Sequence, residues 1–274
     1  MFFRRFLKYS TINSGARSIF RAPEKSFKFG SNMTEIKYLT ADEATDIDKE
    51  LMGPKQGFAT EQLVELAGLA VAHATTHFLT KTRSNPKPFG EGKIVCVSGP
   101  GLNGADGITA ARHLKHYGYD VLVVYPKPTD KEIINNLLLQ CKKLDISVTQ
   151  ELPKDLNTYD LVLDAIFGFS FKGDSIREPF DKIIEDIVTS KVRILSVDIP
   201  SGWDVEKGRN GACKQKVENP DALISLTAPK TCAKQFDGEM HFVGGRFVPH
   251  EMQQRYQLNL PKFEGVEDVA LLNK

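Results

Sequence analysis

The sequence is poor in features that mark several classes of protein. It has four cysteines in 274 residues, at positions 96, 141, 213 and 232, and no two of them form a C-x-x-C pair. This spacing argues against both a zinc ribbon and a disulfide scaffold. The chain also has no run of about 18 uncharged apolar residues, so we expect no membrane span.

Net charge is almost absent as well. Lys and Arg number 36 against 35 Asp and Glu, and the formal net charge of +1 gives no reason to expect nucleic acid as a partner. An apolar content of 41% is enough for a proper core, which excludes bulk disorder. The length predicts one large domain or two ordinary ones.

The charge is unevenly distributed, and its excess lies at the N-terminus. Residues 1–32 carry seven basic side chains, one acidic side chain and five serines. This composition is typical of a mitochondrial transit peptide, and Arg4, Arg5 and Lys8 interrupt the apolar stretch that a secretory signal needs. The alternative is a basic tail without a targeting role. We therefore expect residues 1–33 to be a transit peptide or disordered segment, with a mitochondrial and also a cytoplasmic location.

Residues 34–274 alternate between helical and strand periodicity and contain no linker or repeat, which predicts one α/β domain. Thr40 can cap a helix at 41–52, and Thr60 can cap a second whose apolar residues recur at helical spacing. Further helices are expected at 105–117, at 131–143 and from Pro179 onward, and strands at 93–98, 120–125, 159–165, 193–198, 222–226 and 241–243. Such alternation predicts a mostly parallel sheet with helices on both faces, and ligands bind such sheets beyond the C-terminal strand ends.

The first of these strand ends carries a glycine-rich loop. Gly99, Gly101 and Gly104 match G-x-G-x-x-G between a predicted strand and a predicted helix, where glycines let the backbone approach a phosphate. A dehydrogenase would also need an acid at the end of the second strand, and Tyr125 and Pro126 stand there instead. Asn103 and Asp106, both in the loop, have no use in a purely structural turn. We interpret the loop as a ligand-binding one.

Two later strands each end in aspartate, at Asp164 and Asp198. Either residue alone is explained equally well as a turn acid. Together they predict a polar rim near the glycine loop. Asn103, Asp164 and Ser201 offer hard oxygen donors, which suit K⁺, Na⁺ or Mg²⁺ rather than zinc.

Other polar residues give weaker signals. His73 and His77 are spaced i, i+4 but lack the Glu of H-E-x-x-H, so we expect no metal there. Cys96 lies inside an apolar strand and is expected to be a buried small residue. Lys230 follows the last clear strand at the same sheet edge. It is either a phosphate contact or a solvated side chain.

A family resemblance extends along most of the chain. Its matching segments are 57–68, with Glu65-Leu66-Ala67-Gly68, and 99–107, 164–178, 198–208 and 226–230. In order and spacing the chain resembles the YjeF N-terminal domain family, the NAD(P)HX epimerases, also called apolipoprotein A-I-binding proteins in animals. Leu102 and Ala105 depart from the usual Asn-Asn-Gly-Gly-Asp pattern of the loop, whereas Asn103 and Asp106 keep it.

The resemblance implies a Rossmann-like fold, usually dimeric, that interconverts the R and S forms of hydrated NADH or NADPH. The altered centre is C6 of the nicotinamide ring, and a partner dehydratase then restores the cofactor. A potassium ion would be held by Asn103, Asp164 and Ser201. The dinucleotide site would comprise Leu102, Asn103, Gly104, Ala105, Asp106, Gly168, Phe169, Ser170, Phe171, Lys172, Gly173, Asp174 and Asp198.

Epimerisation at a carbinolamine carbon requires either loss and return of the hydroxyl or ring opening and reclosure. Both routes need a group that takes up and returns a proton within hydrogen-bond reach of the substrate. We expect Asp198 in that role, with Asp106 or Lys172 as helper, and the cation to position phosphates or loops. Two alternatives stay open: a hydride-transferring dehydrogenase, and a non-catalytic nucleotide- or protein-binding module on the same fold.

Overall fold

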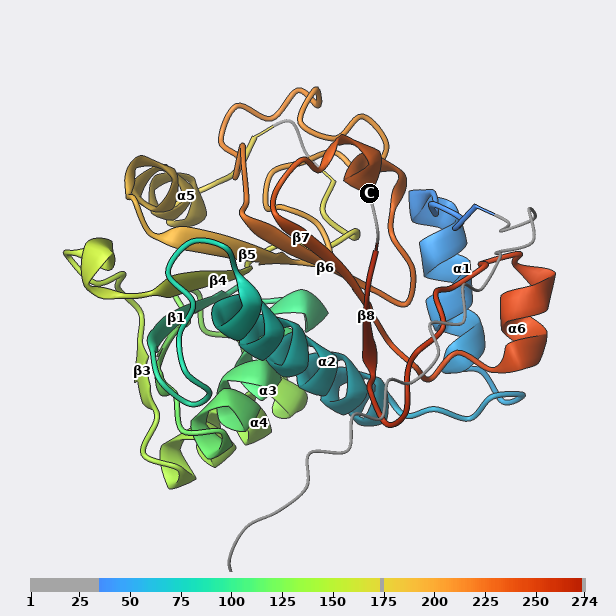
Figure 1. The fold of residues 1–274 in the computed structure, drawn as a ribbon, viewed down its shortest axis with the longest axis horizontal. Helices are drawn as coiled ribbons and strands as arrows, with labels where there is room; N and C mark the ends of the chain where they lie inside the picture. The colour runs from blue at the N-terminus through green and yellow to red at the C-terminus, as the bar shows by residue number, and fades with distance from the viewer. Residues whose placement is uncertain (1–34, 173–174, 273–274) are drawn as a thin grey trace, which may run out of the picture. The chain divides into compact units, whose positions relative to one another are not determined.

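The core of the molecule is an eight-stranded sheet, seen in a computed structural model that describes residues 35–172 and 175–272. The strand order is β3-β2-β1-β4-β5-β6-β7-β8 (Figure 1), and every neighbouring pair is parallel except β7 with β8. The strands are β1 (Lys93–Ser98), β2 (Asp120–Val124), β3 (Ser147–Thr149), β4 (Leu161–Ala165), β5 (Arg193–Val197), β6 (Ala222–Leu226), β7 (Met240–Gly244) and β8 (Val269–Leu271).

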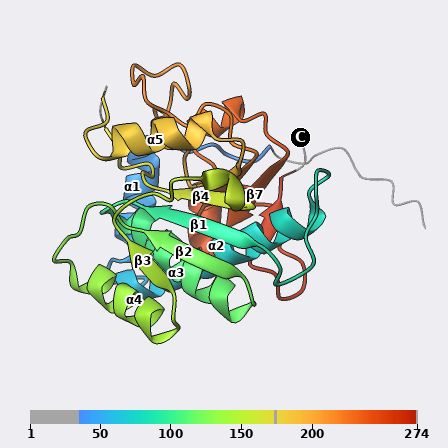
Figure 2. The same ribbon diagram turned by 90° about the vertical axis from the view of Figure 1, so that its left-hand side faces the viewer.

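Helices cover both faces of this sheet, as Figure 2 shows. The longest three, α2 (Thr60–Lys81), α3 (Leu102–His116) and α4 (Glu132–Lys143), lie on one face, and α5 (Phe180–Thr189) lies on the other. Strand β1 contributes side chains to the apolar clusters on both faces of the sheet, because successive side chains of a strand point to opposite faces. Cys96 packs in the cluster with α2, α3 and α4, whereas Val95 and Val97 pack in the cluster with α5. This is a single α/β domain, as predicted.

A smaller apolar cluster joins α1 (Ala41–Leu51) and α6 (His250–Arg255) beside the main sheet. Helix α1 begins with a capping box, in which Thr40 Oγ1 accepts the Glu43 N–H and Glu43 accepts the Thr40 N–H. Its apolar face then packs onto α6 and onto Ala228 after β6. This packing brings α1 to the C-terminal ends of the strands. Among the described residues, no helix is both long and apolar enough to cross a membrane.

The strand and helix predictions are confirmed in place, with differences at the ends. Helix α3 starts at Leu102 rather than 105, because Gly101 in extended conformation is its N-cap. The N-cap of α2 is Ala59, where Gln62 accepts the backbone N–H, and not Thr60. Three short elements, β3, β8 and α6, and the 3₁₀ turns Leu156–Thr158 and Thr231–Gln235 were not predicted. The expected transit peptide and the site residues Gly173 and Asp174 lie outside the described residues.

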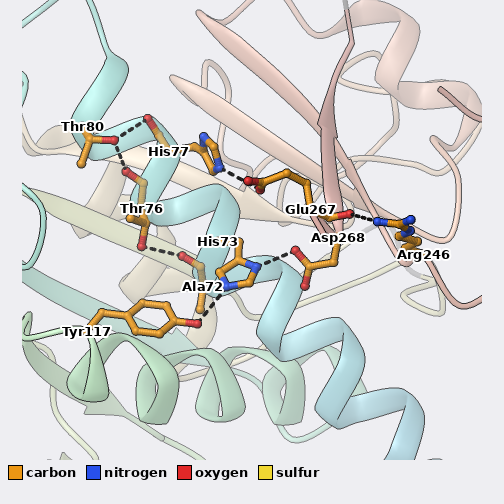
Figure 3. A network of polar contacts seen from close by, with 9 residues as sticks. All are labelled: Ala72, His73, Thr76, His77, Thr80, Tyr117, Arg246, Glu267 and Asp268. Carbon is orange, nitrogen blue, oxygen red and sulfur yellow. Dashed lines mark hydrogen bonds and ion pairs between the residues drawn. The ribbon is translucent and has the colours of Figure 1, made fainter. Parts of the chain in front are cut away.

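Polar contacts fasten the C-terminal segment to α2 (Figure 3). His73 Nδ1 lies 2.5 Å from Asp268 Oδ1, and its Nε2 lies 2.9 Å from the Tyr117 hydroxyl of α3. One turn along α2, His77 Nε2 is 3.4 Å from Glu267 Oε2. Arg246 donates to the Glu267 carbonyl at 3.0 Å. We call these residues the C-terminal clamp; they are structural, and the predicted absence of a metal at the two histidines stays a prediction.

Candidate active site

The strand order reverses direction between β1 and β4, and this switch point is where open parallel sheets bind ligands. The loops after β1 and β4 both open there onto a cavity of about 460 Å³, within the usual range for small-molecule sites. Residues of α1 and α2 also line it. Its mouth carries Lys131, which donates to the Pro100 carbonyl at 2.9 Å.

The three glycines of the loop after β1 have different roles. A Cβ added at Gly99 would stand 1.9 Å from the Ile166 carbonyl oxygen, and one at Gly104 would stand 1.9 Å from the Gly99 carbonyl oxygen. These two glycines therefore allow backbones to pack against each other. A Cβ at Gly101 would meet nothing within 4 Å, and Gly101 lines the cavity. Gly101, at the start of α3, is the glycine that leaves space for a ligand.

Asp198 is held rigidly at the floor of the cavity. It is 3% exposed and has a φ of +65°, a left-handed conformation that Asp tolerates better than most residues. Its Oδ2 accepts the Phe169 N–H at 3.1 Å, and its Oδ1 is ion-paired with Lys230 Nζ. Lys230 is 2% exposed and also donates to the Leu226 carbonyl at 2.8 Å. Lys230 is therefore not a solvated side chain; it is the partner of Asp198, and its contact with a phosphate stays a prediction.

Two further carboxyl groups face the same cavity. Asp106, in the first turns of α3, is 8% exposed, and Asp48 reaches the cavity from α1. Burial raises the pKa of Asp106 well above its ordinary value, and the charges of Asp198 and Asp48 raise it further while Lys230 opposes the rise. Burial also raises the pKa of Asp48 to about 6, against the opposing charge of Lys230. Three carboxyls and one buried ammonium thus share a low-dielectric site.

Asp164 lies beneath the cavity rather than on its surface. It is fully buried, and Ser201 Oγ donates to its Oδ1 at 2.5 Å while Ser196 Oγ donates to its Oδ2 at 2.8 Å. Burial raises the pKa of Asp164, and these hydrogen bonds oppose the rise. Ser201 Oγ also accepts the Phe167 N–H at 3.1 Å, so it supports the loop after β4.

Asn103 completes this group from the side of the glycine loop. Its amide oxygen would lie 3.1 Å from a Cβ at Gly168, the residue after Phe167. Its amide nitrogen is buried and has no partner in the described part of the chain. Asn103, Asp164 and Ser201 therefore converge on one short piece of backbone, residues 166–168. Within residues 35–172 and 175–272, no group of three or more His, Cys, Asp or Glu is placed to hold a metal, and an amide–carboxylate–hydroxyl set is a different kind of site.

Aromatic side chains form the roof of the cavity. Phe167, Phe169 and Phe171 come from the loop after β4, and the first and last stack with ring centroids 4.6 Å apart. Lys172 does not line this cavity but a neighbouring one of about 360 Å³, together with Trp203 and Lys207. The expectation that Lys172 assists Asp198 is therefore not supported by its position, because the side chain is exposed and lines the other cavity.

Comparisons with known proteins identify the family. The family described as YjeF-related protein N-terminus matches residues 60–232. A curated NAD(P)H-hydrate epimerase of Dictyostelium discoideum is 46% identical over 237 residues, covering 85% of this chain and 95% of that protein. The chain belongs to the YjeF-related N-terminal family. A crystal structure of a yeast protein, ynu0 (YNL200c), superposes with a TM-score of 0.78 at 36% identity, covering 86% of this chain and 100% of the yeast chain.

The YjeF-related segment contains all of the site residues that sequence analysis predicted. Of the predicted dinucleotide residues, those lining the cavity are Leu102, Asn103, Asp106, Gly168, Phe169, Ser170, Phe171 and Asp198. Gly104 and Ala105 are buried below the loop and do not line it.

Sequence analysis missed Asp48, which precedes the YjeF-related segment. A signal was present: Asp48 lies four residues after Ala44 and three before Leu51, on the apolar face of α1. A carboxylate at a core-facing position of a helix indicates either a buried partner or a site.

Proposed function

We propose that this protein is an NAD(P)HX epimerase, an isomerase that interconverts the R and S forms of hydrated NADH and NADPH in cofactor repair. The observation that carries the proposal is the cavity at the switch point, which combines an aromatic roof with three carboxyls and a buried lysine. The relative from Dictyostelium, which carries the name NAD(P)H-hydrate epimerase, supports the same substrate and reaction.

The two halves of the cavity suit the two chemical parts of such a substrate. The start of α3, with Gly101 facing open space, offers backbone N–H groups to phosphate oxygens. The aromatic roof and the apolar wall from α2 suit a nicotinamide-derived ring and keep water away from it. Asp198, fixed by Lys230 and the Phe169 N–H, contacts the ligand at the cavity floor. The end of β2 is followed directly by Tyr125 and Pro126 and not by the acid that a dehydrogenase uses to contact the ribose, and the Tyr125 hydroxyl lies 3.0 Å from Thr129 Oγ1.

We further propose that Asn103, Asp164 and Ser201 hold a potassium ion. Asp164 is a fully buried carboxylate whose hydrogen-bond donors in the described chain are all neutral, so a cation beside it would offset the cost of its charge. Carboxylate, amide and hydroxyl oxygens are the donors that hard cations prefer. The ion would supply positive charge and fix the loops after β1 and β4 against each other.

The decisive assay starts from purified R-NADHX and follows its conversion to the S form by chromatography, against a blank without protein. We expect conversion well above the spontaneous rate, and faster in potassium than in sodium as the only monovalent cation. Absence of conversion, with NADHX still raising the melting temperature, would favour the binding-module alternative. Equal rates in both salts would reject the potassium site alone.

The remaining proposals concern the cellular setting. We propose that the protein acts as a homodimer, that a separate dehydratase consumes its S product, and that the basic segment 1–33 directs it to mitochondria, with a further pool in the cytoplasm. The Arg-rich, acid-poor composition of the N-terminus supports mitochondrial targeting. A fluorescent fusion with and without residues 1–33 tests it: loss of mitochondrial signal on deletion is expected, and an unchanged distribution would reject it.

A further inference from the structure

Two of the three cavity carboxyls have no partner of their own. Neither the Asp48 nor the Asp106 side chain accepts or donates a hydrogen bond within the described residues, although both line the cavity. Asp198 differs from them because both of its oxygens are already engaged, one by Lys230 and one by the Phe169 N–H. The Asp48 and Asp106 carboxyls are therefore available to a ligand that enters the cavity.

These contacts indicate different roles for the three carboxyl groups. Asp198 cannot take a proton from a ligand without giving up its contact with Lys230 or with the Phe169 N–H, because both of its oxygens are engaged. A carboxyl without a partner, beside other negative charges, can hold a proton and release it. Asp48 is the less buried of the two unpaired acids, and it reaches from α1 the cavity that the phenylalanines of the loop after β4 also line.

We propose that Asp48 is the acid–base group that exchanges the proton with the C6 hydroxyl of the hydrated nicotinamide, with Asp106 as its unpaired neighbour. Asp198 and Lys230 then serve as the fixed ion pair that orients the ligand. This inference rests on the proposed epimerase function and deepens it, because it names the proton carrier of that site.

The step balances without any co-reactant. The protonated Asp48 carboxyl donates to the C6 hydroxyl, the C6–O bond breaks with its electron pair on oxygen, and water leaves. The N1 lone pair forms a C6=N1 bond, giving a cation that the nearby carboxylates stabilise. Water then adds to the other face of C6 and the C6=N1 electrons return to N1, while the proton that this water loses passes through a second cavity water to the Asp48 carboxylate.

The electrostatics of the cavity agree with this assignment. The charged groups that line the cavity with Asp48 are Asp106 from α3, Asp198 after β5, Lys230 after β6 and the exposed Lys131. Burial raises the pKa of Asp48 to about 6, with Lys230 opposing and Asp198 adding to the rise. A general acid functions best when its pKa lies near the working pH.

The test compares Asp48→Asn with Asp46→Asn, an exposed acid on the same helix paired only with Lys49 at 3.9 Å. Conversion of R-NADHX is measured from pH 5 to 8.5, with protein-free blanks at each pH. In the wild type, kcat/KM should fall as pH rises through about 6, as Asp48 loses its proton. Asp48→Asn should lower kcat at least about 100-fold and leave KM nearly unchanged. It should also abolish the fall of kcat/KM as pH rises through about 6. Asp46→Asn should match the wild type.

Folding of the variant is checked independently. Because the pKa of Asp48 is higher in the folded protein than its ordinary 3.8, the stability from its proton is complete below pH 3.8 and lost as pH rises through about 6. Asp48→Asn should therefore melt at or above the wild-type temperature at pH 8. If Asp48→Asn keeps the wild-type rate and the wild-type fall of kcat/KM with pH, Asp48 is not the acid–base group, and the epimerase function is unaffected by that result. Absence of conversion by the wild type would overturn both.

Discussion

At the residue scale, the glycines of one loop show how a single motif mixes folding and binding. Gly104 and Gly99 lie where backbones meet, so a methyl group at either would strike a carbonyl oxygen at 1.9 Å. Gly101 has open space and an ordinary φ of −98°, so alanine there keeps the fold. The sequence pattern G-x-G-x-x-G cannot separate these roles, because spacing alone does not report which glycine faces the ligand.

We therefore predict opposite outcomes for Gly104→Ala and Gly101→Ala. The first should lower the free energy of unfolding by about 3 kcal/mol or more, since a clash between backbones is not relieved by moving a side chain. The second should change that free energy by less than about 0.5 kcal/mol but raise KM for NADHX, because its methyl group enters the ligand space. Urea unfolding and the epimerisation assay measure the two effects. If Gly104→Ala and Gly101→Ala have equal free energies of unfolding, the two glycines do not have the separate roles assigned to them.

Sequence reasoning found Asp164 and Asp198 because parallel strands end at one edge of a sheet, whatever the details of packing. It could not find the pairing of Asp198 with Lys230, which depends on the left-handed turn at Asp198 and the loop after β6. It also missed Asp48, because the approach of α1 to the strand ends is set by a distant apolar cluster with α6 and Ala228.

At the element scale, the short segments were the hardest to predict. Strands β3 and β8 have three residues each, too few to display a two-residue period, and α6 spans less than two turns. Their positions are fixed by tertiary contacts instead. Strand β8 pairs antiparallel with β7 at the sheet edge, and the C-terminal clamp next to it holds Asp268 and Glu267 against α2.

The clamp should make the attachment of β8 depend on pH. The hydrogen bond to Asp268 raises the pKa of His73 above 6.5, with burial opposing the rise. A raised histidine pKa adds stability that is complete below pH 6.5 and is lost as pH rises through the folded-state value. Amide hydrogen exchange at residues 269–271, corrected for intrinsic rates, should therefore be slower at pH 6 than at pH 8.5.

Asp268→Asn should remove this difference and speed exchange at pH 6 to near the rate at pH 8.5, while the strands at the centre of the sheet stay protected. Glu264→Gln, an exposed acid earlier in the same segment, serves as the control and should behave as the wild type. A pH difference that survives in Asp268→Asn would show that another group holds the strand.

At the scale of the whole molecule, the four cysteines lie in different parts of one fold. Cys96 lies in β1, Cys141 in α4 and Cys232 in the turn after β6. Cys213 is also buried, at 3% exposed, but it lies in the loop between β5 and β6, where it lines the smaller cavity. Burial raises the pKa of Cys96 and of Cys232 to about 12 and that of Cys141 to about 11. These three thiols are therefore protonated and shielded at neutral pH, and the thiolate is the reactive form.

Thiol labelling should consequently separate local from global opening. In the native protein at pH 8, N-ethylmaleimide followed by mass spectrometry should modify Cys213 first, because opening one surface loop exposes it. The other three should react together, at the much slower rate of global unfolding, because each lies within the interior that unfolds as one unit.

The variant Cys213→Ser should remove the fast phase of labelling and leave the slow phase unchanged. NADHX should slow the three-thiol phase further, since a ligand that binds only the folded state reduces the unfolded population. Rapid modification of Cys96, Cys141 or Cys232 in the native protein would mean that parts of the sheet and its helices open locally, without global unfolding.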